Sequence, residues 1–205
     1  MSLRTTVKAS NITNLSDARY CAGMGVEMIG FSMDAGSAHF VEPKKYHEMR
    51  AWVAGVQIVG QTESDNVAEV ESLLAVYAPD VLEVSYPEII QKLSGQIPLI
   101  YKIVIDGIAP DDLDDLLQLT RGKIAFALLE ANQNEPLNEQ WTDFLGLIAH
   151  EYPILLGFGI TANNVRALTE KIPVKGIGLA GSYEIKPGHN DFGVLMDVLE
   201  QLEQD

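Results

Sequence analysis

Polar side chains follow several short apolar runs of this 205-residue chain at the places where the runs end. Ser10 and Asn11 follow the run Thr5–Ala9, and Glu130 follows Ile124–Leu129. A carboxylic acid can donate a proton, and histidine is the residue type most often used as a general base, which makes His39, in the loop after the second run, a candidate. A serine can act as a base only if a partner takes its proton. The sequence thus offers Ser10, Glu130 and His39 as candidates for proton transfer.

Two glycine-containing segments late in the chain are candidates for binding phosphate. Gly159 and Ile160 follow the seventh apolar run, and Gly181 and Ser182 follow the eighth. Backbone N–H groups in such loops are ready-made anion donors. The alternative is that the fold needs tight loops there, where glycine relieves steric strain.

Lys8 and Lys102 interrupt two of the apolar runs. Lysine is seldom buried without a reason. Two placements remain open for both residues. Either they point inward and raise the potential towards an anion, or their long stems reach the surface.

Short apolar runs alternate with segments of helical period along the whole chain. Near-continuous apolar runs are typical of strands that are covered on both faces. The predicted strands are Thr5–Ala9, Glu27–Phe31, Val56–Gly60, Asp80–Val84, Leu99–Ile105, Ile124–Leu129, Ile154–Phe158 and Lys175–Ala180. The predicted helices are Leu15–Met24, Pro43–Val53, Asp65–Tyr77 with Ser64 as its cap, Pro87–Leu93, a segment starting near Pro110, Glu139–Glu151, Asn163–Lys171 and Asp191–Glu203.

This repeated strand–helix order requires parallel strands joined by right-handed crossovers. A closed barrel and an open doubly wound sheet both satisfy it. About eight repeats favour the barrel, and the first strand lacks the Gly-x-Gly-x-x-Gly signal of a dinucleotide-binding open sheet. We therefore predict one domain over residues 1–205, a single (β/α)8 TIM barrel of the α/β class. Its active site should lie at the carboxyl ends of the strands.

The net charge of the chain disfavours some classes of binding partner. A formal net charge of −15 disfavours nucleic acid and anionic membrane surfaces, which clustered Lys and Arg would bind. No apolar run is long enough to span a bilayer, and the start of the chain shows no signal peptide. One cysteine, Cys21, fits a reducing cytoplasm. The four histidines show no metal-ligand spacing, so we expect neither a metal nor a cofactor.

Several motifs resemble the phosphoribosylanthranilate isomerase family of tryptophan biosynthesis. "KASNITNLSDA" is similar to the family's opening K-x-C-G-I-T-N-x-x-D-A, and "GSAHFVEPKK" to its K-S-P-R-Y-V-S-P loop. "LLGFGITANNV" is similar to L-S-G-G-L-x-P-E-N-V, and "GLAGSYEIKPGHND" to D-V-S-S-G-V-E-x-x-P-G-x-K-D. The order and spacing extend over nearly the whole chain. The resemblance implies a barrel enzyme that carries out an Amadori rearrangement of a phosphorylated sugar-type ligand.

The differences from the family pattern fall on its functional positions. The resemblance puts Ser10 where the family has its catalytic cysteine, Glu130 where it has its acidic aspartate, and His39 where an arginine meets the anthranilate carboxylate. It also leaves a phosphate cradle at Gly159, Ile160, Gly181 and Ser182.

Three hypotheses follow from these replacements. The chain is a working isomerase with a replaced base, a barrel acting on a related phosphorylated metabolite, or a non-catalytic paralogue that binds a ligand or partner. Loss of the thiol, the aspartate and the arginine together predicts that the family's isomerisation is absent or very weak. The sequence does not indicate an oligomeric state.

Overall fold

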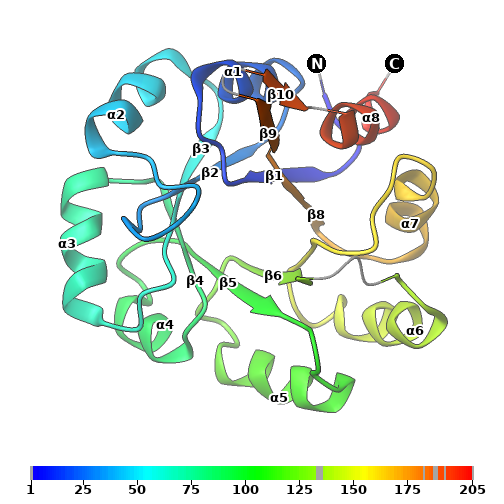
Figure 1. Ribbon diagram of the computed structural model, residues 1–205. Coiled ribbons are helices and arrows are strands. Elements are labelled where there is room, and N and C mark those ends of the chain that lie inside the picture. Colours follow the sequence, from blue (N-terminus) through cyan, green and yellow to red (C-terminus); the bar gives the residue numbers. More distant parts are fainter. Residues whose placement is uncertain (1, 133–135, 182, 187–188, 192, 205) are drawn as a thin grey trace.

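The chain folds into a closed barrel of parallel strands surrounded by helices (Figure 1). The structure, a computed structural model, describes residues 2–132, 136–181, 183–186, 189–191 and 193–204. Each strand pairs with the next, and β8 pairs with β1 to close the barrel. The strands are β1 (Thr6–Ser10), β2 (Met28–Ser32), β3 (Gln57–Gln61), β4 (Val81–Val84), β5 (Leu99–Val104), β6 (Phe126–Glu130), β7 (Ile154–Leu156) and β8 (Gly176–Ala180). This arrangement confirms the predicted TIM barrel.

Most of the helices begin at a capping asparagine or at a proline. They are α1 (Leu15–Gly23), α2 (Pro43–Trp52), α3 (Val67–Tyr77), α4 (Pro87–Leu93), α5 (Pro110–Leu119), α6 (Glu139–Ile148), α7 (Val165–Lys171) and α8 (Gly193–Leu202). The side chain of Asn14 accepts a hydrogen bond from the Asp17 N–H at the start of α1. Asn66, not the predicted Ser64, caps α3 and accepts from the N–H groups of Ala68 and Glu69. Either residue type can cap a helix, so the register of the first turn decided between them.

A two-stranded antiparallel sheet, β9 (Tyr183–Lys186) with β10 (His189–Asp191), follows β8. The predicted last helix, Asp191–Glu203, therefore starts two residues later, at Gly193. The sequence around β9 and β10 lacks the long apolar alternation that would have predicted a strand pair. Its Pro–Gly pair was the available turn signal.

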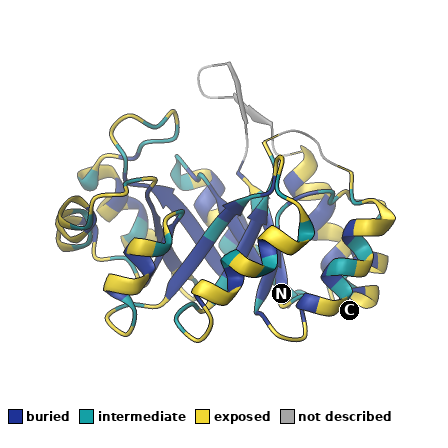
Figure 2. Cartoon of the chain, turned by 90° about the horizontal axis from the view of Figure 1, so that it is seen from below, coloured by how far each residue is buried: buried dark blue, intermediate teal, exposed yellow. Residues whose placement is uncertain are grey.

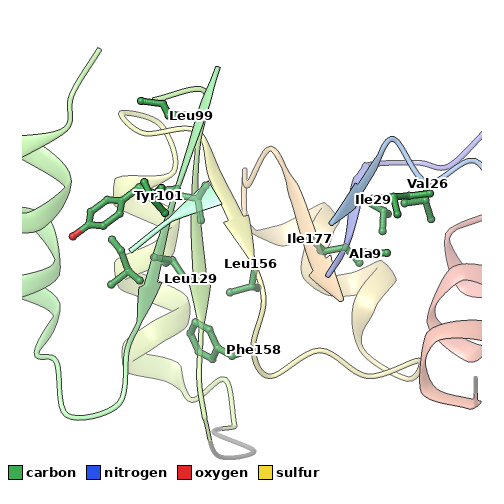
Figure 3. Packing of buried hydrophobic residues seen from close by; sticks show 14 of the residues in the cluster. Ala9, Val26, Ile29, Leu99, Tyr101, Leu129, Leu156, Phe158 and Ile177 are labelled. Carbon is green, nitrogen blue, oxygen red and sulfur yellow. The ribbon is translucent and has the colours of Figure 1, made fainter. Parts of the chain in front are cut away.

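Two apolar layers hold the barrel together. The outer layer lies between the strands and the helices and includes Ala9, Ile29, Leu129, Leu156 and Ile177 (Figure 3). The inner layer fills the barrel and consists of Met28, Val59, Val81, Ile100, Leu128 and Leu155, with Phe126 packed against it. Because both faces of each strand are covered, the strands are buried while the outer faces of the helices are exposed (Figure 2).

Cys21 lies on α1 and is completely buried in the outer layer. Burial, together with the nearby Asp17 carboxylate, raises the pKa of its thiol to about 12. The thiol therefore stays protonated and unreactive at neutral pH. No helix among the described residues is both long and apolar enough to cross a lipid bilayer.

Candidate functional site

The carboxyl ends of the strands carry a polar layer inside the barrel. Its members lie on or just after β1, β3, β4, β5 and β6: Ser10, Gln61, Glu83, Lys102 and Glu130. Side chains two positions apart on a strand point to the same face. The inner apolar layer contains the residues that stand two positions before Gln61, Glu83, Lys102 and Glu130. The polar layer thus lies directly above a packed floor.

A buried ion pair joins Glu83 of the polar layer to Lys8, which lies two residues before Ser10 on β1. Lys8 Nζ lies 2.6 Å from Glu83 Oε2, and the two side chains are 0% and 3% exposed. The same ammonium donates a hydrogen bond to Ser10 Oγ at 2.6 Å. Of the two placements left open for Lys8, the structure shows the inward one. Ser10 is therefore an acceptor from a cation rather than a hydroxyl paired with a base.

Gln61 connects this pair to the end of β1. Its Nε2 donates to Glu83 Oε1 at 2.7 Å, and its Oε1 accepts from the Asn11 backbone N–H at 2.9 Å. Asn11 has a left-handed conformation with φ of 59°, which is unusual for a residue other than glycine. A Cβ at Gly30 would lie 2.6 Å from Gln61 Oε1, so only glycine at this position leaves room for the Gln61 side chain.

Glu130 lies at the end of β6 within the electrostatic field of the same groups. Burial raises the pKa of its carboxyl and the charge of Glu83 raises it further, whereas Lys8 and Lys102 act in the opposite direction. The net effect is a raised pKa, which favours the protonated form that a general acid needs. Gly157 leaves space for this side chain, since a Cβ there would lie 3.0 Å from Glu130 Cγ.

A polar cavity of about 220 Å³, here called the mouth cavity, opens beside this layer. Its lining includes Asn11, His39, Gln61, Glu63, Glu83 and Lys102. Lys102 Nζ pairs with the Glu63 carboxylate, so Lys102 also lies at the barrel mouth. Burial lowers the pKa of Lys102, but the bond to Glu63 and the charges of Glu63, Glu83 and Glu130 outweigh it and raise the pKa overall.

His39 and Glu83 thus line the same cavity. Glu130 lies near enough to Glu83 for the charge of Glu83 to raise its pKa. Reasoning from the sequence missed the roles of Glu83 and Glu63, which pair with Lys8 and Lys102. The signal for Glu83 was its charge within the apolar run Asp80–Val84. A closed barrel buries the side chains of such a strand. Among the described residues, no cluster of His, Cys, Asp or Glu is arranged to hold a metal ion.

The loop after β7 is tightly packed at Gly159, and the role of this residue in binding phosphate stays a prediction. Gly159 has φ of +66°, and a Cβ there would lie 2.8 Å from both the Cβ and the backbone N of Leu137. Asn164 Nδ2 donates a hydrogen bond to the Gly159 carbonyl at 2.8 Å. The Gly181 N–H already donates to the Ser10 carbonyl at 2.7 Å. Ser182 lies outside the described residues, and the role of Ile160 stays a prediction.

Comparison with known proteins gives sequence relatives of one kind. No protein-family model matches the chain. Two curated proteins named N-(5'-phosphoribosyl)anthranilate isomerase, from Pelobacter propionicus and Geobacter metallireducens, are each 24% identical to it, over 191 and 190 residues. The matches cover 90% of this chain, and 89% and 92% of the two relatives.

Over nine-tenths of its length, the chain is similar in sequence to phosphoribosylanthranilate isomerases.

Solved structures of phosphoribosylanthranilate isomerases share the whole barrel. The enzyme from Thermotoga maritima superposes with a TM-score of 0.80 at 17% identity, over 97% of this chain and 98% of that one. The enzyme from Thermus thermophilus gives 0.76 at 22% identity, over 96% and 98%. A third isomerase structure gives 0.75 at 18% identity, over 97% and 98%, and contains reduced 1-(o-carboxyphenylamino)-1-deoxyribulose 5-phosphate.

Proposed function

We propose that this protein binds a phosphorylated sugar-type ligand at the carboxyl-terminal mouth of its barrel, and that its turnover of phosphoribosylanthranilate is very slow or absent. The observation that carries this proposal is the hydrogen bond that the Ser10 side chain accepts. Its hydroxyl oxygen accepts from the Lys8 ammonium at 2.6 Å, and that ammonium is held by buried Glu83. The proposal places the protein in the cytoplasm, where its single cysteine stays reduced.

The base is the missing part of the family reaction. In the Amadori rearrangement an acid protonates the ring oxygen and a base removes the proton from C2 of the sugar. A serine hydroxyl needs a neighbouring group that takes its own proton before it can remove another. A protonated lysine cannot do so, because it has no free electron pair. The hydrogen bond from Lys8 instead occupies an oxygen lone pair that Ser10 would need in order to accept a proton.

The acid is the part that the chain keeps. Glu130 retains a carboxyl group at the end of β6, and burial raises its pKa towards the range of a working acid. His39 is the candidate replacement base, because it lines the cavity that Glu83 and Lys102 also line. An isomerase with a replaced base is therefore the second candidate, and a non-catalytic paralogue that binds a ligand or a partner protein is the third.

The experiment is isomerisation of phosphoribosylanthranilate by purified protein, followed through loss of substrate fluorescence. We expect no turnover by the wild type and measurable turnover by the Ser10→Cys variant, because a thiol can be tuned to act as a base. Ser94→Cys, in the loop before β5, is the matched control that adds a thiol far from the mouth. Clear turnover by the wild type that is lost in His39→Ala and Glu130→Gln would overturn the proposal in favour of the second candidate.

Ligand binding is tested separately from turnover. Calorimetric titration with ribulose 5-phosphate should give binding, and titration with ribulose should give much weaker binding. Gly159→Ala should abolish the difference, because a Cβ there collides with Leu137 and strains a backbone with φ of +66°. Gly122→Ala is the matched control, since its φ is +73° but no atom lies within 4 Å of the new Cβ. Equal affinity for both sugars would leave the non-catalytic, partner-binding candidate.

A further inference from the structure

Ser32 places an unengaged hydroxyl group in the mouth cavity. It stands four residues after Met28 of the inner apolar layer and two after Gly30, so its side chain points into the barrel. Ser32 is 5% exposed and belongs to the cavity lining. Among the described residues, nothing forms a hydrogen bond with its hydroxyl. Because native structures usually satisfy buried polar groups, a ligand is the partner that this hydroxyl lacks.

Asn11 places a second unengaged group in the same cavity. Its carboxamide has no hydrogen-bond partner in the part of the chain that the structure describes, and Asn11 also lines the cavity. Its φ of 59° is a left-handed conformation that glycine adopts without steric cost. The opening motif of the family that the chain resembles, K-x-C-G-I-T-N, has glycine where this chain has Asn11. Asparagine is less favourable for this backbone, but it adds a donor and an acceptor to the cavity.

Gln61 connects the positions of these two residues. Ser32 is the register partner of Gln61 between β2 and β3, and Gln61 Oε1 accepts from the Asn11 N–H at 2.9 Å. The other end of the same amide donates to Glu83 Oε1 at 2.7 Å. The Gln61 side chain is thus held at both ends, and Asn11 and Ser32 are both fixed relative to it.

The charged side chains of the cavity are already bonded within the protein. Lys102 pairs with Glu63, and Lys8 pairs with Glu83. Asp34 Oδ2 accepts from the Glu63 N–H at 2.7 Å. The two unengaged groups, by contrast, are neutral, and each can both donate and accept a hydrogen bond. A sugar hydroxyl has the same capacity.

We infer that Asn11 and Ser32 are specificity-determining residues that hold the C2 hydroxyl of the sugar, one donating a hydrogen bond to it and the other accepting one from it. The inference rests on the proposed function, in which the loops after β7 and β8 hold the phosphate. β8 stands next to β1 in the barrel, and β2 follows on the other side of β1. A five-carbon sugar with its phosphate on C5 therefore extends its C1–C2 end over β1 and β2.

The test compares ribose 5-phosphate with 2-deoxyribose 5-phosphate by calorimetric titration. The two compounds carry the same phosphate and differ only in the hydroxyl at C2. The wild type should bind ribose 5-phosphate about tenfold to a hundredfold more tightly, because the deoxy compound leaves both side chains without a partner. A site built to bind a hydroxyl discriminates against an analogue that lacks it for the same reason.

Ser32→Ala should reduce this preference about tenfold. It should not lower the midpoint of thermal unfolding, because the deleted hydroxyl has no partner among the described residues. Ser85→Ala is the matched control. Ser85 Oγ is also buried and unpartnered within the described part of the chain, but Ser85 is not in the lining of the mouth cavity. The control should keep the preference of the wild type.

Asn11→Gly should reduce the preference by a similar factor and keep or raise the unfolding midpoint, because glycine relieves the left-handed backbone. Ala78→Gly is the matched control. Ala78, at the exposed end of α3, is the other described residue besides glycine with a positive φ, 47°. This variant should also keep or raise the midpoint, but it should leave the preference unchanged.

The outcomes separate the inference from the proposed function. Equal binding, or no binding, of the two ribose phosphates beside clear binding of ribulose 5-phosphate would overturn the inference and leave the proposed function standing. A preference that survives in both Ser32→Ala and Asn11→Gly would also overturn it, as would an equal loss in the two controls. Failure of all three sugar phosphates to bind would overturn the proposed function and the inference together.

Discussion

The interior of the barrel has two layers that follow the same strand pattern and have opposite chemistry. Towards the amino ends of the strands, Val59, Val81, Ile100 and Leu128 pack into an apolar floor. Two residues further along the same four strands stand Gln61, Glu83, Lys102 and Glu130. The floor uses side chains that need no partner, whereas every charged group above it depends on others. On each of these strands, a side chain that packs the barrel interior is followed two positions later by a side chain that can take part in chemistry. Packing and chemistry therefore depend on different residues of the same strand.

Removal of one partner of the buried pair should have the largest effect. Lys8→Met leaves the Glu83 carboxylate uncompensated inside the barrel, so we expect a loss of about 3–5 kcal/mol in the free energy of unfolding, measured by urea denaturation. Lys8→Met combined with Glu83→Gln should recover much of that loss, since no buried charge remains. A double variant as unstable as the single one would contradict the view that the charge, rather than the packing, carries the cost.

A truncation in the floor should cost almost as much for a different reason. Leu128→Ala removes buried carbon atoms and leaves a cavity beside Gly157 and Gly178, so we expect a loss of about 2–5 kcal/mol in the same measurement. Its affinity for ribulose 5-phosphate should stay close to that of the wild type. A selective loss of affinity in the folded variant would show that the floor positions the polar layer directly.

Overpacking the floor should have a smaller effect. A Cβ at Gly178 would lie 2.5 Å from Leu128 Cδ1, so Gly178→Ala forces Leu128 to move and should cost about 1–3 kcal/mol. Gly178→Ala combined with Leu128→Val should be closer to the wild type than either variant alone, because the second change makes room for the methyl group. Additive losses in the unfolding measurement would argue against this contact.

The smallest expected effect is a pH dependence of stability in the polar layer. Above the ordinary pKa of 4.5, the Glu130 carboxyl of the unfolded chain ionises while the folded one, with its raised pKa, keeps its proton. The folded state then holds more protons, so stability falls as pH rises until the folded carboxyl ionises too. Glu130→Gln should lack this fall, so its unfolding free energy relative to wild type should increase above pH 4.5. Glu71→Gln, which removes an exposed glutamate of α3, is the control and should show no such increase.

The sequence alone predicted the barrel because its signals are local. Each apolar run and each helix start, such as Pro43 or Pro87, reports on its own segment, and the repeat order then leaves few topologies. Each predicted strand lies within two residues of the observed one at both ends. The small antiparallel sheet after β8 was missed because its strands are short and its sequence carries little alternation.

The candidate site was only partly predictable, because its contacts join distant parts of the chain. Ser10, Glu130 and His39 could be named from motif positions. That Lys8 would pair with Glu83, or that Gln61 would hold the Asn11 N–H, depends on barrel closure and on glycine at position 30. The charge balance of the mouth cavity depends on these pairings in turn. The strand-end residues therefore predict a candidate site at this end of the barrel, but they do not predict which side chains neutralise one another.

The enclosure of Cys21 has a practical consequence for work on this protein. Because its thiol is buried and its pKa is raised to about 12, thiol-specific dyes and spin labels should leave the folded wild type unmodified. Any accessible cysteine introduced by mutation would then be the single attachment point for a probe. A fluorophore or spin label on the loop around Ser37 could report ligand arrival at the mouth cavity without any background from the native thiol.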